Sequence, residues 1–406
     1  MKKAFKIGGL LLAVMVIAGG VFMAYVALRG IPSYPVPRLE LRVQATQDSV
    51  ARGRKLARLL CVSCHLDPAT GALTGKHMPD VPAKFGVVYS PNITQDKTYG
   101  IGSWTDGELA YLLRTGIRRD GRYEPPYMIK LPHASDDDMA AILAFLRSAD
   151  PMVKASAVPS RSPEPSFLTK LLCYFAFKPL PYPKQPVPSP DKANRLSQGQ
   201  YLANGVLDCY GCHSAAFQTN NPLQPELSAG FYGGGNTFPG ANGTNIQATN
   251  ITPDPGTGIG SWTEAQFVTA LRKGFRTDRS PLRYPMPIYV DLDEEEARAI
   301  FAYLRTVPPL VKSYPRPQAA TAAAGSAGKQ LYQKYGCDGC HGESGRDPVD
   351  LGGAAQKYPA DAQLTAFLKR PTDFVPTAQM PAFEGVIAED EYAPLVEHVR
   401  SLQSKQ

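Results

Sequence analysis

Three short segments decide the fold of this 406-residue chain, and each has the pattern Cys-x-x-Cys-His. They read Cys61-Val-Ser-Cys64-His65, Cys209-Tyr-Gly-Cys212-His213 and Cys337-Asp-Gly-Cys340-His341. One helical turn sets the two thiols of each segment where both can form thioethers to haem vinyl groups, and the adjacent histidine is placed to bind the iron. The pattern is typical of c-type haem attachment. We therefore expect three covalently attached haem c groups.

Two other interpretations of such cysteine pairs fit less well. A structural zinc ion needs four ligands in one place, whereas each segment offers three. A thioredoxin-type disulfide does not require a histidine after the second cysteine, and here one follows all three times. Cys173, the seventh cysteine, stands outside the pattern. It is expected to be a buried small side chain, and the alternative of an axial thiolate has no support from spacing.

The first two segments belong to an internal repeat. Residues 92–106 read NITQDKTYGIGSWTD and residues 250–264 read NITPDPGTGIGSWTE, an offset of 158 that also relates Met128 to Met286. The cysteine pairs are offset by only 148, so the second copy holds ten additional residues near the glycine run 233–235. We expect this insertion to form a surface loop.

Each copy also repeats the same predicted helices. A short helix precedes the cysteines, and Thr105 and Thr263 each begin a capping box, which predicts that helices start at the next residue. A final helix follows, with apolar residues at i, i+3, i+4 and i+7 from Met139 and from Ala297. After the third cysteine pair, helices are expected near 360–369 and 389–402.

Methionines are the expected second axial ligands of the irons. A methionine in that position raises the reduction potential and closes the iron to substrate. The candidates must follow the cysteine pair and precede the final helix of each unit, and they are Met128, Met286 and Met380. Alternatives for the first haem are Met78 and a second histidine, His77 or His133.

The N-terminus predicts a membrane segment. Residues 7–28 carry no charge and lie between Lys6 and Arg29, a run of 22 residues that is long enough to span a bilayer. The alternative, a cleaved secretory signal, usually has an apolar region of only about 7–15 residues. Because haem c is attached outside the cytoplasmic membrane, we expect everything after Leu28 to lie on the periplasmic side.

The net charge of +7 is unevenly distributed. Residues 1–50 hold six basic and two acidic side chains, and residues 151–195 hold seven and two. No predicted folded block is basic enough for a nucleic-acid binder, and the pattern favours an anionic lipid surface. The second basic segment has nine prolines between Pro159 and Pro190, around an apolar stretch at 167–177. That stretch is expected to be an interfacial helix, a docking strip for a partner, or a segment packed over the neighbouring domains.

The predicted fold is all-α, with three cytochrome c-like haem domains in tandem after an N-terminal transmembrane helix. The expected boundaries are a signal anchor at 1–30, a tether at 31–49, domain 1 at 50–150, a Pro-rich linker at 151–195, domain 2 at 196–312, a second linker at 313–324 and domain 3 at 325–406.

With its N-terminal anchor and three haem motifs, the chain resembles the tri-haem cytochrome c subunit of bacterial membrane-bound dehydrogenases of the alcohol, aldehyde or gluconate type. The paired NIT…GIGSWT segments and the methionine motifs YPMPIY (284–289) and MPAF (380–383) also carry the resemblance, which covers about residues 50–403. The first domain departs from the family pattern at PPYM (125–128). The resemblance implies that His65, His213 and His341 are proximal ligands and that Met286 and Met380 are distal ones.

The resemblance further implies that the chain accepts electrons from a periplasmic dehydrogenase catalytic subunit and passes them to quinone or a terminal oxidase. We therefore expect an electron-transfer subunit rather than a catalytic one. Two alternatives are a haem enzyme with one open-coordination iron, of peroxidase-like or thiol-oxidising activity, and a cytochrome subunit of a terminal oxidase complex.

Overall fold

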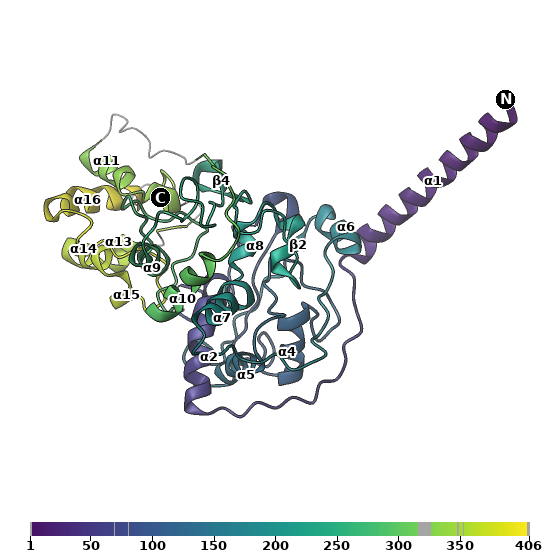
Figure 1. Cartoon of the computed structure of the whole chain (residues 1–406), viewed down its shortest axis with the longest axis horizontal. Helices are drawn as coiled ribbons and strands as arrows, with labels where there is room; N and C mark the ends of the chain where they lie inside the picture. The colour runs from purple at the N-terminus through teal and green to yellow at the C-terminus, as the bar shows by residue number, and fades with distance from the viewer. Residues whose placement is uncertain are drawn as a thin grey trace.

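The computed structural model describes residues 2–68, 70–79, 81–315, 326–346, 349–351 and 353–403. Within these residues the fold is all-α, as predicted. It consists of helices joined by long loops, and its strands form only two small antiparallel pairs. The helix α1 (Lys2–Arg29) projects away from the body of the molecule (Figure 1). The predicted linker 313–324 lies mostly outside the described residues.

Domain 1 is built on the packing of its first helix against its last. In chain order its elements are α2 (Gln47–Leu60), α3 (Val62–His65), η1 (Ala83–Phe85), β1 (Gly86–Val87), α4 (Asp106–Thr115) and α5 (Asp136–Leu146). Helix α4 begins where the capping box predicts, because the Thr105 hydroxyl accepts a hydrogen bond from the Glu108 N–H at 3.1 Å and the Glu108 carboxylate accepts one from the Thr105 N–H at 2.8 Å.

The predicted linker 151–195 lies against domain 1 rather than spacing two domains apart. It contains β2 (Glu164–Pro165), which pairs with β1, and α6 (Phe167–Phe175). Helix α6 packs on η1 and on α1, and its Thr169 hydroxyl donates to the Phe85 carbonyl at 2.7 Å. The apolar stretch is therefore a helix seated between the body of domain 1 and the base of α1.

Domain 2 repeats this arrangement with an insertion. Its elements are α7 (Arg195–Gln200), η2 (Tyr201–Val206), α8 (Cys209–His213), η3 (Phe217–Thr219), η4 (Pro225–Leu227), β3 (Thr237–Pro239), η5 (Ala241–Gly243), β4 (Asn245–Gln247), α9 (Glu264–Lys273) and α10 (Glu294–Leu304). The hairpin β3–β4 lies in the inserted region. The hairpin is at the surface, with Thr237 and residues 243–245 exposed, whereas Gly233 and Gly234 of the glycine run are buried. A Cβ on Gly234 would stand 2.5 Å from the Ala248 carbonyl, so this segment must pass close to its neighbour.

The segment η2 is a π-helix, and the repeat explains it. The helix glycines Gly53 and Gly199 are 146 residues apart, whereas the first cysteines of the two motifs, Cys61 and Cys209, are 148 apart. The second copy therefore carries two more residues between the same two structural landmarks. A wider π turn absorbs inserted residues without breaking the helix.

Domain 3 is shorter and stands on its own core. Its described elements are α11 (Ala327–Lys334), α12 (Asp338–His341), α13 (Ala354–Lys357), α14 (Asp361–Lys369), α15 (Pro371–Phe374), η6 (Glu389–Glu391) and α16 (Tyr392–Gln403). Buried apolar residues of domains 1 and 2 form one shared cluster, while those of domain 3 form a second cluster that includes Phe275 of domain 2. The three predicted domains thus share two hydrophobic cores.

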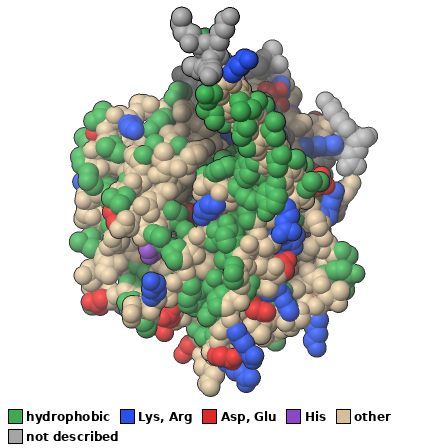
Figure 2. All heavy atoms as spheres, turned by 90° about the vertical axis from the view of Figure 1, so that its right-hand side faces the viewer, with side chains coloured by type: hydrophobic (Ala, Val, Ile, Leu, Met, Phe, Trp, Pro, Cys, Tyr) green, Lys and Arg blue, Asp and Glu red, His purple; other side chains and the backbone are tan. Residues whose placement is uncertain are grey.

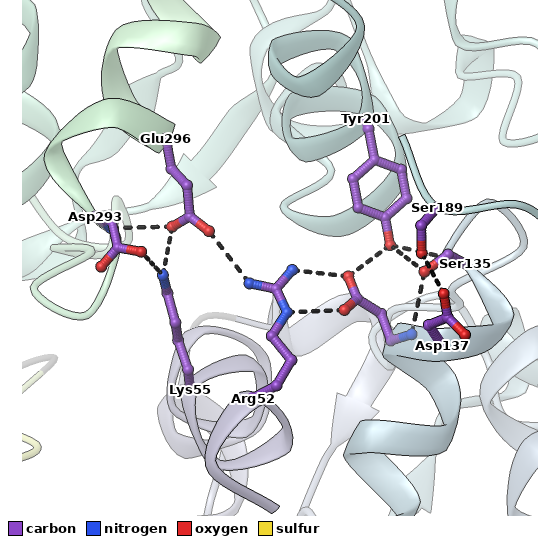
Figure 3. Close-up of polar contacts among 9 residues, drawn as sticks. Arg52, Lys55, Ser135, Asp137, Ser189, Tyr201, Asp293 and Glu296 are labelled. Atoms are coloured by element: carbon purple, nitrogen blue, oxygen red, sulfur yellow. Dashed lines mark hydrogen bonds and ion pairs between the residues drawn. The ribbon is translucent and has the colours of Figure 1, made fainter. Parts of the chain in front are cut away.

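Domains 1 and 2 meet through an exchange of equivalent side chains (Figure 3). Lys55 on α2 pairs with Glu296 on α10 at 2.7 Å, and Tyr201, which lies 146 residues after Lys55, donates to Asp138 on α5 at 2.7 Å. Asp138 and Glu296 are themselves related by the repeat offset of 158. Each copy therefore gives the other a polar contact at the equivalent position, an ion pair in one direction and a hydrogen bond in the other, much as in an isologous dimer interface.

Arg52 lies at the centre of this interface. Its guanidinium binds the Asp138 carboxylate through two nitrogens, at 2.8 and 2.9 Å, and reaches the Glu296 carboxylate at 3.2 Å. Both carboxylates are only 7% exposed. Because buried carboxylates are costly unless paired, Arg52 compensates both and ties the two domains together.

Candidate haem-binding sites

The three cysteine motifs adopt the same local structure. Each lies on a single short helix (α3, α8 or α12) or at its start, directly after the helix that opens its domain. None of the seven cysteines, all of which lie among the described residues, is in a disulfide. Each pair is therefore separated by one helical turn and available for two thioether bonds, as the spacing predicts.

Each motif histidine is held by a backbone carbonyl through Nδ1. The distances are 2.8 Å from His65 to Pro91 O, 2.8 Å from His213 to Thr249 O and 2.8 Å from His341 to Val349 O. Because a carbonyl only accepts, Nδ1 must carry the proton, which leaves Nε2 with a free lone pair in the neutral ring. Burial lowers the pKa of all three imidazoles and so favours this neutral form. The residues present fit an axial ligand of iron at three sites.

The same surroundings disfavour the rival interpretations of the cysteine pairs. Burial raises the pKa of Cys61, Cys209 and Cys337 to about 12, whereas the reactive cysteine of a redox Cys-x-x-Cys motif has a lowered pKa. Among the residues that the structure describes, no group of three or more His, Cys, Asp or Glu side chains is arranged to hold a metal ion. The donors suit covalent haem attachment better than zinc or disulfide exchange.

The repeated NIT segments have a defined task beside the histidines. Asn92 Oδ1 accepts hydrogen bonds from the backbone N–H and the hydroxyl of Thr94, at 2.9 and 2.7 Å, and Asn92 Nδ2 donates to two backbone carbonyls. Asn250 and Thr252 make the same pair of contacts at the same distances. These asparagines are therefore turn residues that fix the conformation of the loop. The residue directly before each one, Pro91 or Thr249, provides the carbonyl that accepts the hydrogen bond from the histidine Nδ1.

The carbonyls of Pro91, Thr249 and Val349, which hold the three histidines, could not be found from the cysteine motifs alone. Pro91 and Thr249 are related by the repeat offset of 158, so aligning the two copies would have shown that both residues occupy the same position. Val349 of domain 3 has no such counterpart in the repeat.

The predicted methionine ligands lie in different surroundings. All three are half-buried. Met286 packs at the edge of the core shared by domains 1 and 2, and Met380 packs against the core of domain 3. Met128 belongs to neither cluster and lies in a turn where its N–H donates to Pro125 O at 3.2 Å. Their assignment as distal ligands stays a prediction.

The alternative ligands have other contacts. His77 is exposed and lies against the Tyr89 ring at 5.3 Å. His133 Nε2 is 2.9 Å from Pro222 O, at the boundary with domain 2. Cys173 is fully buried on α6, as expected for a small buried side chain, and burial raises its pKa to about 11.

Segments that follow or carry the cysteine motifs of all three domains converge at one junction. A small cavity there is lined by Ser63 from the first motif, by 287–291 directly after Met286, and by Gln379 directly before Met380. The Ile288 N–H donates to Gln379 Oε1 at 3.1 Å. The Tyr284 backbone hydrogen-bonds the Cys340 thiol. The methionine loop of domain 2 therefore contacts the haem-binding segments of both neighbours.

Comparison with known families agrees with this geometry. Residues 50–150 match the model of the family described as cytochrome c, and residues 323–399 match that of cytochrome c oxidase, cbb3-type, subunit III.

Several relatives with curated descriptions are cytochromes as well. The chain is 30% identical over 280 residues to the cytochrome c subunit of a quinone alcohol dehydrogenase of Gluconacetobacter polyoxogenes, covering 65% of this chain and 57% of the relative. It is 29% identical over 295 residues to the fructose dehydrogenase cytochrome subunit of Gluconobacter japonicus, covering 70% and 57%. It thus spans little more than half the length of these relatives.

A shorter relative is covered more fully. The chain is 30% identical over 264 residues to a protein described as a diheme cytochrome c-type from Cereibacter sphaeroides, covering 61% of this chain and 82% of the relative. With the cysteine, histidine and loop geometry already described, the chain therefore belongs to the c-type cytochrome family that includes the cytochrome subunits of alcohol, fructose and gluconate dehydrogenases.

Proposed function

We propose that the chain is a membrane-anchored cytochrome with three covalently attached haem c groups, which relays electrons from a periplasmic dehydrogenase to quinone or another respiratory acceptor. Bound haem supplies one-electron redox chemistry at each site. The observation that carries the proposal is the threefold histidine geometry, in which a backbone carbonyl holds each Nδ1 and so leaves the Nε2 lone pair for iron, beside two cysteines that are not in a disulfide.

The chain's own contribution is to hold its attachment segments together. The pair of Lys55 and Tyr201 contacts fixes domain 2 on domain 1, and the loop after Met286 fixes domain 3 on domain 2. These contacts support a relay in which domain 2 stands between the other two. Names of the relatives support a dehydrogenase as the electron donor.

The N-terminal helix supports anchoring. Its part Phe5–Arg29 is long and apolar enough to cross a membrane, and almost none of its most apolar part is buried against the protein. If α1 crosses the membrane, the attachment chemistry puts the three domains on the periplasmic side.

The haem count is tested by intact mass and haem staining of the chain purified from membranes. Three haem additions are expected, and replacing Cys337 and Cys340 together with Ala should remove one of them. Two additions in the unmodified chain would refute the third site.

The donor is tested by co-purification from mildly solubilised membranes, followed by reduction with alcohols, aldehydes, sugars and sugar acids. The dehydrogenase assignment predicts a co-purifying catalytic subunit whose substrate reduces the haems. If no such substrate reduces them while another donor does, that assignment fails.

One observation favours a second candidate. Domain 3 matches the model of a subunit of cbb3-type cytochrome c oxidase, which suits a cytochrome subunit of a terminal oxidase complex. Co-purification of an oxidase catalytic subunit, with oxygen consumption on reduction, would support it over the dehydrogenase partnership.

A further inference from the structure

Helix α6 is apolar on the side that faces away from the protein. Thr169 and Cys173 point into domain 1 and are 1% and 0% exposed. The stripe at i, i+1, i+4, i+5 and i+8 on the other side holds Phe167, Leu168, Leu171, Leu172 and Phe175. A surface helix in water normally turns polar residues outward, so this one has the reverse pattern.

The exposed part of this stripe is substantial. Phe167, Leu168 and Phe175 are 37%, 39% and 67% exposed. Figure 2 views the molecule from the side from which α1 projects, and hydrophobic side chains form a connected area down that face with Lys and Arg side chains beside it. Connected apolar areas on a protein surface mark an interaction site.

The position of α6 along α1 indicates what covers the stripe. Phe22 of α1 contacts the rings of Tyr174 and Phe175 at 5.9 and 5.5 Å, and Tyr25 contacts Tyr174 at 5.9 Å. Phe22 and Tyr25 precede the end of α1 at Arg29 by seven and four residues, or about 6–10 Å along the helix axis. If α1 spans a bilayer, this depth is the boundary between acyl chains and headgroups. Tyrosines are enriched at that boundary.

The charges around α6 suit the same surroundings. Lys170 lies on the helix, Lys178 follows it and donates to the Tyr174 carbonyl, and Arg29 ends α1. Exposed Lys84 lies 5.2 Å from the centre of the Phe85 ring in the neighbouring η1 segment. Glu164 of β2 is the acidic residue nearest along the chain. Basic side chains beside an apolar strip are typical of a helix that lies in an anionic membrane surface.

We propose that α6 is a second membrane contact, a helix whose outer stripe is immersed in the interface of an anionic bilayer next to the end of α1. This inference rests on the proposed anchoring by α1. As a consequence, the orientation of domain 1 on the membrane is fixed. Two adjoining contacts prevent domain 1 from rotating about α1 and keep one face of the molecule against the membrane.

The test uses the full haem-loaded chain in lipid nanodiscs of mixed phosphatidylcholine and phosphatidylglycerol. A photoreactive benzoylphenylalanine replaces Phe175 or Leu168 in the test variants. In the control it replaces Phe374, a phenylalanine of similar exposure, 42%, on α15 of domain 3. After illumination, mass spectrometry identifies what each position is joined to.

We expect lipid adducts at 175 and 168, at least ten times as abundant as at 374. Extraction of the unmodified chain from membranes by alkaline carbonate tests α1 separately. A chain that resists extraction but gives no lipid adducts at 175 and 168 overturns the α6 proposal and leaves anchoring intact. Adducts to a protein instead of lipid also overturn it, in favour of a docking strip. A chain that carbonate releases overturns both proposals.

Discussion

At the scale of single residues, one carbonyl decides the chemistry of each motif histidine. The Nδ1 contact fixes the tautomer, and the free Nε2 is what an iron requires. The second axial position depends on a longer loop whose course is set by packing. Met286 and Met380 lie against hydrophobic cores, and such packing restricts where the sulfur can move.

The first prediction concerns Met380. Met380→Ala should lower the potential of one haem by on the order of 100 mV, because a methionine ligand raises the potential within the roughly 0.8 V range that axial ligands span. It should also let carbon monoxide bind one ferrous haem. Redox titration and absorption spectra measure both effects. The control, Met152→Leu, changes a buried methionine that is not a candidate ligand of any haem and should change neither. An unchanged titration in Met380→Ala would exclude Met380 as a ligand.

At the scale of helices, a glycine makes the crossing of the first and last helix possible in every domain. A Cβ on Gly53 would stand 1.8 Å from Ala141 O, one on Gly199 would stand 1.9 Å from Ala299 O, and one on Gly328 would stand 2.1 Å from Pro394 O. The contacting atoms are backbone, so they cannot rotate away. These glycines set how closely the helices approach, and that approach positions the cysteine motif that follows each first helix.

Gly53→Ala is therefore expected to destabilise the protein. Intrinsic helix propensity favours Ala over Gly by about 1 kcal/mol, but forcing the helices apart costs about 1–3 kcal/mol beyond that gain. Thermal unfolding monitored by circular dichroism measures the difference. The matched control is Gly256→Ala, since a Cβ there would meet its nearest atom at 3.7 Å in an exposed loop. A Gly53→Ala protein as stable as the control would show that the helices can separate at no cost.

Arg52 offers a second test at this scale, between domains. Arg52→Met leaves Asp138 and Glu296 without their shared cation, and we expect a loss of about 1–3 kcal/mol, less than for a fully buried pair because the Arg52 side chain is 34% exposed. Equilibrium denaturation measures the loss, and solution scattering should show a broader distance distribution as the domains loosen. Arg38→Met removes a pair whose side chains are 89% and 79% exposed, and it should cost almost nothing. Equal effects of the two substitutions would contradict the role of Arg52 in holding domains 1 and 2 together.

Local chemistry made much of this fold predictable. The capping residues Thr105 and Thr263 place the starts of α4 and α9, and apolar spacing places α5 and α10, because these signals act within one or two turns. The reciprocal contacts of Lys55 with Glu296 and of Tyr201 with Asp138 were not predictable, since each joins residues that are distant in sequence. The equivalent positions 55 and 201 also hold different residue types. The burial of Gly233 and Gly234 was not predictable for a related reason: a glycine indicates a turn or a close approach equally well, and only the packed neighbour at Ala248 distinguishes them.

At the scale of the whole molecule, the two hydrophobic cores divide the chain unevenly. Domains 1 and 2 share one cluster of buried residues and are joined by the ion pairs of Arg52. Domain 3 has its own cluster, which contacts domain 2 through Phe275, whose ring lies 5.5 Å from that of Phe383. Residues with a common core unfold together, and separate cores can unfold separately. The positive charge of the chain is concentrated near the N-terminus and α6, which leaves the body of the molecule close to neutral.

This division predicts which domains are destabilised when one haem is lost. Replacing Cys337 and Cys340 with Ala should remove one haem and abolish or lower only the unfolding transition of domain 3, because its core contains few residues from the rest of the chain. Replacing Cys61 and Cys64 with Ala should remove one haem and destabilise domains 1 and 2 together, since Leu56, Val62 and Leu207 lie in the same cluster. Scanning calorimetry in detergent, with haem absorbance as a second probe, separates the transitions. If the two variants lower every transition alike, the chain unfolds as one unit and the contact through Phe275 couples the cores more strongly than their separation implies.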